Sequence, residues 1–242
     1  MPDATASLSV SVWRGGPEAG AFQAFDVPAL KNQTVLDVVA WIQRNAEPTL
    51  SYRFACRVGM CGSCAMMVNG QPRWTCRTHV RKVAEDGRLE IAPLRNLPVI
   101  KDLAVDMDPF FDKWVKAEGV FHSSTDRAAD IAPVRPSTPA RVAADAGIEC
   151  INCAVCYAAC DSVAANPDYL GPAALNRAWT LLNDAKDSGR ALILDAVSRP
   201  GGCTSCHSQG SCERFCPNEL SPLTSIAGLK REAAWRFLRK ES

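Results

Sequence analysis

The chain has 242 residues, of which 47% are hydrophobic, and a formal net charge of +1. This length fits two ordinary globular domains, and the nearly neutral charge argues against a nucleic-acid binder, which would need a basic surface. No segment has the roughly 18 successive apolar residues of a membrane span, and the first residues lack the basic start and apolar run of a secretion signal.

The first 98 residues predict a small α+β domain. Alternating apolar and polar side chains and short apolar runs predict strands over residues 8–14, 22–27, 65–68, 73–76 and 89–91. Thr34 is the expected N-cap of a helix that ends before Pro48. Asn69-Gly70, between two of these strands, is a strong hairpin signal. We therefore expect two hairpins, one packed helix and a cysteine loop on the surface.

The chain changes character after Pro98. Apolar residues recur at helical spacing over residues 100–115, although Pro109 should interrupt or restart the helix. A polar, proline-rich surface connection follows. Thr138-Pro139 then predicts a helix start, and further helices are expected over 173–185, 190–197 and 221–239. The predicted organisation is an α+β domain over 1–98, a connecting helix and linker over 99–138, and a helical domain over 139–242.

The twelve cysteines form three compact groups. The groups are Cys56, Cys61, Cys64 and Cys76; Cys150, Cys153, Cys156 and Cys160; and Cys203, Cys206, Cys212 and Cys216, followed by Pro217. Disulfide frameworks suit short secreted chains, and structural zinc prefers two similar cysteine pairs. The C-x4-C-x2-C spacing is typical of plant-type 2Fe–2S ferredoxins, and the later groups are similar to the paired runs of two-cluster bacterial ferredoxins. Iron–sulfur ligation is the preferred interpretation, with zinc as the alternative.

In paired runs the fourth cysteine of one run commonly ligates the cluster of the other. This pattern predicts a 4Fe–4S set and a second, interleaved set. The first is Cys150, Cys153, Cys156 and Cys216, and the second is Cys160, Cys206 and Cys212. Gln209 stands where a fourth thiolate would be expected, so the second set predicts a 3Fe–4S centre. Cys203 is then a spare cysteine, interpreted either as a small buried side chain or as an alternative ligand.

The loop between Cys56 and Cys64 contains residue types that suit a cluster. Gly59 and Gly62 can adopt positive φ, which lets backbone N–H groups approach the sulfurs. Such donors stabilise the more negative reduced state. Arg53 and Arg57 either add positive charge near the cluster or form an ordinary solvated surface.

These motifs together resemble one family over nearly the full chain: the iron–sulfur subunits of succinate dehydrogenases and quinol:fumarate reductases. The resemblance rests on the segment from Ser51 to Cys64, on Arg95-Asn-Leu-Pro-Val-Ile-Lys-Asp-Leu103, and on the run from Cys150 to Cys160. It rests also on Asn166-Pro-Asp-Tyr-Leu-Gly-Pro-Ala-Ala174 and on the segment from Cys206 to Pro217.

The resemblance implies a fold and a function. The fold is α+β: an N-terminal β-grasp 2Fe–2S ferredoxin domain followed by an all-α helical ferredoxin-like domain with 4Fe–4S and 3Fe–4S clusters. The implied subunit relays electrons between the FAD of a flavoprotein subunit and quinone at a membrane anchor. The partner subunits would hold FAD and quinone, with haem as an open alternative, and this chain would have no dicarboxylate active site. It would be peripheral, on the cytoplasmic face of the membrane, or the matrix face in a mitochondrion.

Some residues depart from the family pattern. Asp161 stands where members usually have Pro, and Val163-Ala164-Ala165 replaces the tryptophans that line a ubiquinone pocket, which favours fumarate-reductase-like or menaquinone-linked members. His207 matches a quinone-proximal histidine of some members; otherwise it caps a helix or binds a carbonyl. The alternatives for the whole chain are an iron–sulfur subunit of another flavin-dependent dehydrogenase and a zinc-bearing interaction module.

Overall fold

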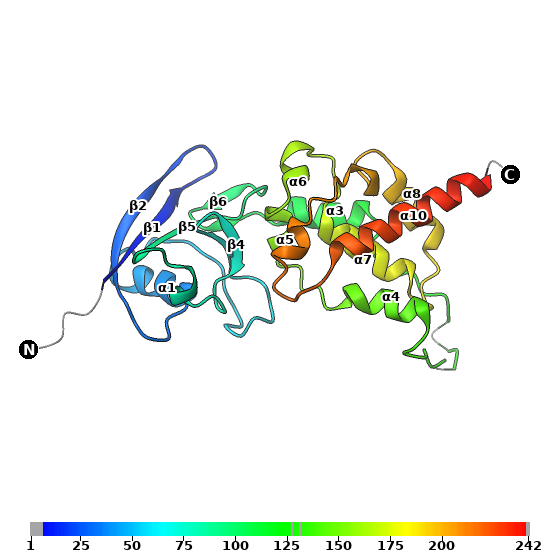
Figure 1. Ribbon diagram of the computed structural model, residues 1–242, viewed down its shortest axis with the longest axis horizontal. Helices are drawn as coiled ribbons and strands as arrows, with labels where there is room; N and C mark the ends of the chain where they lie inside the picture. Colours follow the sequence, from blue (N-terminus) through cyan, green and yellow to red (C-terminus); the bar gives the residue numbers. More distant parts are fainter. Residues whose placement is uncertain (1–6, 127, 131, 241–242) are drawn as a thin grey trace, which may run out of the picture. The chain divides into compact units, whose positions relative to one another are not determined.

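The protein is described here by a computed structural model that covers residues 7–126, 128–130 and 132–240. It consists of two compact units. The first unit takes the chain up to Met107 together with Ile151–Ala159, and the second takes Asp108–Cys150 and Cys160–Ser242. Figure 1 labels the elements of each unit.

The described part of the first unit contains a five-stranded sheet in the order β2-β1-β5-β3-β4. Its strands are β1 (Ser7–Gly15), β2 (Gly20–Pro28), β3 (Ala65–Val68), β4 (Gln71–Trp74) and β5 (Arg88–Ala92). The hairpins β1–β2 and β3–β4 are antiparallel, whereas β1 and β5 run parallel. All five expected strands are confirmed; β4 begins two residues earlier than expected because Gln71 directly follows the Asn69-Gly70 turn.

Helix α1 (Val35–Asn45) covers one face of this sheet (Figure 1). Thr34 and Asp37 form a capping box: Thr34 Oγ1 accepts from the Asp37 N–H at 3.2 Å, and the Asp37 carboxylate accepts from the Thr34 N–H at 3.0 Å. This satisfies donors that a helix start leaves unpaired. The apolar face of α1 then packs with the inward side chains of β1 and β5 in one core, whose members include Val10, Val12, Val38, Ile42, Leu89 and Ile91.

The expected helix over 100–115 is wrong in its first half. Residues 99–105 form a hairpin of β6 (Val99–Lys101) and β7 (Ala104–Val105), and helix α3 (Asp108–Lys116) begins only next to Pro109. Asp102, at φ 52°, turns the chain between these strands. Leu103 does not face a helix partner, because its side chain belongs to the core of the first unit.

The short segment Ile151–Ala159 belongs to the first unit and contains helix α5 (Val155–Ala158). Asn96 Nδ2 donates to the Tyr157 carbonyl at 2.9 Å, and Arg95 Nε donates to the Ala158 carbonyl at 3.3 Å. These bonds satisfy carbonyls at the end of a helix too short to satisfy them itself. The first unit also contains α2 (Val80–Val83).

The second unit is built from helices. Besides α3, the described helices are α4 (Pro139–Ile148), α6 (Asp161–Ala165), α7 (Pro172–Leu182), α8 (Arg190–Ser198), the 3₁₀ turn η1 (Cys203–Ser205), α9 (Ser211–Arg214) and α10 (Pro222–Lys240). Helix α7 is buried along almost its whole length, and α3, α4, α8 and α10 pack against it (Figure 1). The predicted helix starts at Thr138-Pro139 and Ser221-Pro222 are confirmed.

Helix α10 packs on its own unit through its first half. Ile226 and Leu229 are buried, but Phe237, which lies at helical spacing from them, is 63% exposed. The apolar face of α10 is therefore covered only in part. Within the described residues, no helix is both long enough and apolar enough to cross a membrane.

Candidate metal centres

The first cysteine loop wraps backbone donors around one sulfur. The N–H groups of Val58, Met60 and Cys61 point at Cys56 Sγ at 3.4, 3.2 and 3.4 Å. The loop can curl this tightly because it passes through left-handed conformations, at φ 78° in Gly59 and 69° in Gly62. The expectation that these two glycines bring N–H groups toward a sulfur is confirmed.

The same donors change the chemistry of the thiols. Hydrogen bonds from the Val58 and Met60 N–H groups are the largest effects that lower the pKa of Cys56, to about 6. Cys76 shows the opposite behaviour, because burial and then its neighbour Cys64 raise its pKa to about 12. The four thiols of the first group thus lie close enough to interact, and a cationic iron core would favour the thiolate form of all of them.

Strands β3 and β4 hold the other two cysteines of this group. Cys64 ends the loop just before β3, and Cys76 follows β4. Thr75 donates its hydroxyl to the Cys64 carbonyl at 2.7 Å, and both Cys64 and Cys76 are buried. Two thiols thus flank a hairpin and two lie on a curled loop; that the four hold one cluster stays a prediction.

The two arginines near this loop have partners. Arg57 lies over the Phe54 ring at 4.8 Å and within 3.9 Å of Asp37, and Arg53 donates to the Val105 carbonyl. Arg57 is nevertheless 42% exposed in its side chain. The Arg57 guanidinium therefore interacts with the Asp37 carboxylate, the Phe54 ring and solvent, and its charge does not act on the cysteines alone.

The second cysteine group is divided between the units. Cys153 and Cys156 belong to the first unit, and Cys150 and Cys216 to the second. The residues between these cysteines include Asn152 and Ala154, both left-handed at φ 59° and 60°. A left-handed residue changes the local direction of the backbone. A run of closely spaced cysteines needs such changes of direction for its thiols to point toward one another. Convergence of these four thiols around one cluster stays a prediction.

The third predicted set comes together within the second unit. Burial, followed by the neighbouring thiols of Cys160 and Cys206, raises the pKa of Cys212 to about 12. Burial also raises the pKa of Cys160, whose sulfur interacts with Cys206. Cys212 is buried and Cys160 is half-buried, so both thiols resist ionisation by themselves, whereas a cationic core would favour their thiolate forms.

Three further residues lie near this set in the sequence. Cys203 is completely buried in η1, and burial raises the pKa of its thiol. Its burial agrees with a small core side chain but leaves its role as an alternative ligand a prediction. His207 is exposed next to Cys206. Asp161, which replaces the usual Pro, occupies the first turn of α6, where a carboxylate suits the helix dipole.

Sequence reasoning missed two residues that contact Cys206. The Ser208 N–H donates to its sulfur at 3.4 Å, and Lys230 Nζ donates to its carbonyl at 2.7 Å. Lys230 comes from a distant part of the chain, so no local spacing marks it. His79 and His122 are half-buried.

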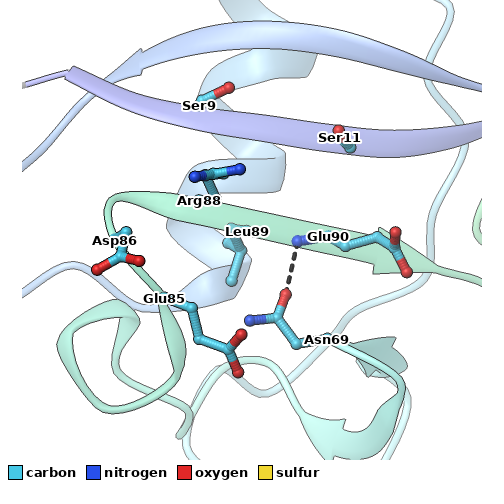
Figure 2. A pocket seen from close by; sticks show the side chains of 8 residues that line it. All are labelled: Ser9, Ser11, Asn69, Glu85, Asp86, Arg88, Leu89 and Glu90. Carbon is cyan, nitrogen blue, oxygen red and sulfur yellow. Dashed lines mark hydrogen bonds between the residues drawn. The ribbon is translucent and has the colours of Figure 1, made fainter.

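A separate hollow of about 580 Å³ lies on the outer face of the sheet in the first unit, where Asn69 Oδ1 accepts from the Glu90 N–H at 2.7 Å (Figure 2). Polar side chains from β1, β5 and the adjacent turns dominate its lining: Ser9, Ser11, Asn69, Glu85, Asp86, Arg88, Leu89 and Glu90. None of them is a predicted ligand. Among the described residues, no group of three His, Cys, Asp or Glu side chains is arranged to hold a single metal ion.

Comparison with protein-family models identifies both parts of the chain. Residues 9–112 match a 2Fe-2S iron-sulfur cluster binding domain, and residues 149–221 match a 4Fe-4S dicluster domain. The 2Fe–2S match includes the first cysteine group, and the dicluster match includes the second and third.

Characterised relatives match almost the whole chain. The Mycobacterium tuberculosis fumarate reductase iron-sulfur subunit is 36% identical, covering 96% of this chain and 94% of the relative. The Haemophilus influenzae fumarate reductase iron-sulfur subunit is 34% identical over 94% and 93%, and the Paracoccus denitrificans succinate dehydrogenase iron-sulfur subunit is 32% identical over 91% and 85%.

A solved structure agrees with this. A chain of the Mycobacterium smegmatis Sdh1 complex in the apo form superposes with a TM-score of 0.84 at 25% identity, covering 96% of this chain and 98% of that one. The expected fold class, a β-grasp ferredoxin domain followed by a helical ferredoxin-like domain, is confirmed. The chain belongs to the family of iron–sulfur subunits of fumarate reductases and succinate dehydrogenases.

Proposed function

We propose that this subunit relays electrons between the FAD of a flavoprotein subunit and quinone at a membrane-anchor subunit, through three centres. Cys56, Cys61, Cys64 and Cys76 would hold 2Fe–2S, Cys150, Cys153, Cys156 and Cys216 would hold 4Fe–4S, and Cys160, Cys206 and Cys212 would hold 3Fe–4S. When bound, these clusters supply one-electron chemistry; the residues of the chain bind them, shield them and adjust their potentials.

The observation that carries the proposal is the convergence of Cys160 with Cys206 and Cys212. These cysteines come from segments on opposite sides of α7 and α8 in the sequence, yet their thiols interact. The interleaved ligand pattern of two-cluster ferredoxins requires this convergence, whereas a local zinc knuckle does not. Gln209 is exposed and supplies no fourth thiolate, which supports the assignment of 3Fe–4S.

The surface of the first cysteine loop supports docking of the flavoprotein there. Val58 and Met60 are 59% and 70% exposed, and Phe54, stacked on Tyr52, is also exposed. Apolar side chains gathered beside a redox centre favour a protein partner that excludes water. We assign this loop to the flavin end and the Cys206 region, with the exposed His207, to the quinone end.

The stretch Val163-Ala164-Ala165 supports a fumarate-reductase-like or menaquinone-linked enzyme. Val163 is buried in α6, and the two alanines offer no aromatic surface to a quinone ring. The subunit would be peripheral, on the cytoplasmic or matrix face, with the membrane helices and any haem on the anchor subunits.

Isolation of the native complex tests the function. We expect iron and acid-labile sulfide without stoichiometric zinc, a 3Fe–4S signal in the EPR spectrum of the oxidised protein, and co-purification of an FAD-bearing chain and a membrane anchor. Assays of succinate oxidation and fumarate reduction separate this enzyme from another flavin-dependent dehydrogenase. Zinc without iron would instead identify an interaction module.

A further inference from the structure

The second half of α10 is attached to its unit along one side only. Arg236 makes this attachment to α8, because its guanidinium donates to the Ala191 carbonyl at 3.0 Å and lies 2.9 Å from the Asp195 carboxylate. Figure 1 shows the last turns of α10 projecting past the other helices of the second unit. The side of the helix opposite Arg236 therefore faces away from α8.

Large apolar side chains occupy that opposite side. Successive residues of an α-helix are about 100° apart around its axis, so Leu238 lies roughly opposite Arg236, with Trp235 and Phe237 on either side of Leu238. Trp235 is 53% exposed, Phe237 63% and Leu238 56%. Apolar side chains gathered in this way on a surface commonly mark a place where another molecule excludes water.

Positive charge accompanies these apolar side chains. Within α10 the sequence has one acidic residue, Glu232, and five basic residues: Lys230, Arg231, Arg236, Arg239 and Lys240. Glu232 is paired with Arg190 of α8, and Arg231, 3.7 Å from the same carboxylate, keeps 64% of its side chain exposed. Arg239 is exposed as well. Arg231 and Arg239 lie one turn before and one turn after Trp235, so both flank the apolar side.

This combination favours a lipid surface over a protein partner. The buried centre of a protein interface is depleted in charged residues, whereas here two exposed arginines adjoin the tryptophan. An anionic bilayer satisfies both features, because its headgroups attract arginine and its boundary with the acyl chains accepts tryptophan and other apolar side chains.

We propose that the end of α10 binds the surface of an anionic phospholipid bilayer. Arg231 and Arg239 would contact the phosphate groups, while Trp235, Phe237 and Leu238 enter the boundary between headgroups and acyl chains. The helix would lie on the membrane without crossing it. The inference uses the membrane that the proposed function requires beside this subunit, but it needs neither a cysteine assignment nor the electron relay.

The first test measures binding of the full-length subunit to vesicles by co-sedimentation. We expect binding to vesicles of equal parts phosphatidylglycerol and phosphatidylcholine, little binding to phosphatidylcholine alone, and weaker binding at high salt. Replacing both arginines, with Arg231→Gln and Arg239→Gln, should weaken binding about thirtyfold. The matched control replaces two exposed arginines of the first unit, with Arg81→Gln and Arg88→Gln, and should bind like the wild type.

The second test examines the apolar side chains. Trp235→Ser with Phe237→Ser should weaken vesicle binding about tenfold, whereas Phe22→Ser with Val115→Ser, which removes side chains that are 50% and 66% exposed elsewhere, should not. Lipids brominated on their acyl chains should quench tryptophan fluorescence of the bound subunit, more strongly when the bromine is near the headgroup than near the chain end. This quenching should be lost in Trp235→Phe.

Three results would overturn the proposal. The first is a wild-type subunit that does not bind the anionic vesicles or binds neutral vesicles equally well. The second is unchanged binding in both double variants of α10. The third concerns the detergent-solubilised complex: if Trp235 there is shielded from iodide and becomes accessible only when another subunit is removed, a protein covers this surface instead.

Discussion

The backbone of Gly62 lies directly against Cys153. A Cβ on Gly62 would stand 2.6 Å from the Cβ of Cys153 and 2.8 Å from its Cα, distances at which two carbon atoms cannot coexist. Gly62 lies within the first cysteine loop, and Cys153 belongs to the second cysteine group, yet both are part of the first unit. The absence of a side chain at residue 62 thus brings two predicted ligand runs into contact.

We expect Gly62→Ala to destabilise the first unit by about 2–4 kcal/mol. Part of the cost is the left-handed conformation, at φ 69°, and the rest is the clash with Cys153. Thermal unfolding and iron content of the purified protein measure the effect. Gly70→Ala is the control, because Gly70 has φ 72° but nothing within 4 Å of its would-be Cβ. Equal losses in the two variants would exclude the contact as the cause.

Asp102 fixes the start of the β6–β7 hairpin to the rest of the first unit. Its carboxylate accepts hydrogen bonds from Arg14 Nε at 2.9 Å, the Gly15 N–H at 3.1 Å and the Ser51 N–H at 2.9 Å, and the residue is 2% exposed. We expect Asp102→Asn to lower the free energy of unfolding by about 2–3 kcal/mol, because the amide cannot accept from all three donors and leaves Arg14 with the Glu47 carboxylate, at 3.3 Å, as its remaining ion pair. Denaturant titration measures this.

The same carboxylate predicts a pH dependence. Burial alone would raise the pKa of Asp102, but hydrogen bonds from Arg14, Ser51 and Gly15, with the Arg14 charge, lower it below 3.8. Its stabilisation is therefore complete above its unfolded pKa and is lost as the pH falls through the lower folded pKa. The stability gap between wild type and Asp102→Asn should narrow below about pH 4. Asp26→Asn, at an exposed site on β2, is the control for the substitution itself and should leave the free energy of unfolding at neutral pH unchanged.

The incorrect first half of the helix predicted over residues 100–115 shows why the spacing of apolar residues alone does not determine secondary structure. The spacing of apolar residues is genuine, and Phe110 is indeed buried on α3. Leu103 occupies the same predicted stripe, but its N–H donates to the Ser51 carbonyl and its side chain joins a different core. A pattern of apolar residues does not specify which partner covers them. Phe237 shows the same limit: it lies at helical spacing from Ile226 and Leu229 yet is 63% exposed, although its neighbour Arg236 donates to the Ala191 carbonyl of α8 at 3.0 Å.

The candidate site was predictable wherever its residues are close in sequence. Spacing alone marked the first cysteine loop, and the two-cluster pattern predicted that Cys160 lies near Cys206 and Cys212, whose thiols act on one another electrostatically. The hydrogen bond from Lys230 Nζ to the Cys206 carbonyl was not predictable, because Lys230 lies on α10, far from Cys206 in the sequence. Tertiary hydrogen bonds of this kind have no local sequence signature.

Asn176 connects three helices of the second unit. Its Nδ2 donates to the Gly147 carbonyl of α4 at 3.1 Å, and its Oδ1 accepts from the Ser225 hydroxyl of α10 at 2.8 Å; the residue is 1% exposed. Asn176→Leu should lower the free energy of unfolding by about 2 kcal/mol, since it leaves the buried Ser225 hydroxyl without its acceptor and removes one donor to the Gly147 carbonyl, which keeps the Cys150 N–H at 3.3 Å. Asn183→Leu is the control: its side chain bonds only within α7, to the Trp179 carbonyl, so the loss in thermal or denaturant unfolding should be near 1 kcal/mol.

Cysteine replacements distinguish the predicted ligands from the spare thiol. Cys160→Ser should abolish the third centre and lower the unfolding temperature of the helical unit, because the interleaved ligation connects distant segments. Cys203→Ser, which replaces a buried thiol of the same unit, should keep all three EPR signals. Native thermal stability in Cys160→Ser would contradict the cross-ligation, and loss of a centre in Cys203→Ser would make Cys203 a ligand.

The first unit is discontinuous in sequence, since Ile151–Ala159 belongs to it while Cys150 and Cys160 on either side do not. The ferredoxin domain is therefore not a portable module. A fragment that ends at Met107 would lack the Cys153 surface that Gly62 fits and the Tyr157 carbonyl that Asn96 binds. Exchanging this domain between related enzymes therefore requires the transfer of both segments together. Recombination at a single point after residue 107 would separate Gly62 from Cys153 and Asn96 from Tyr157.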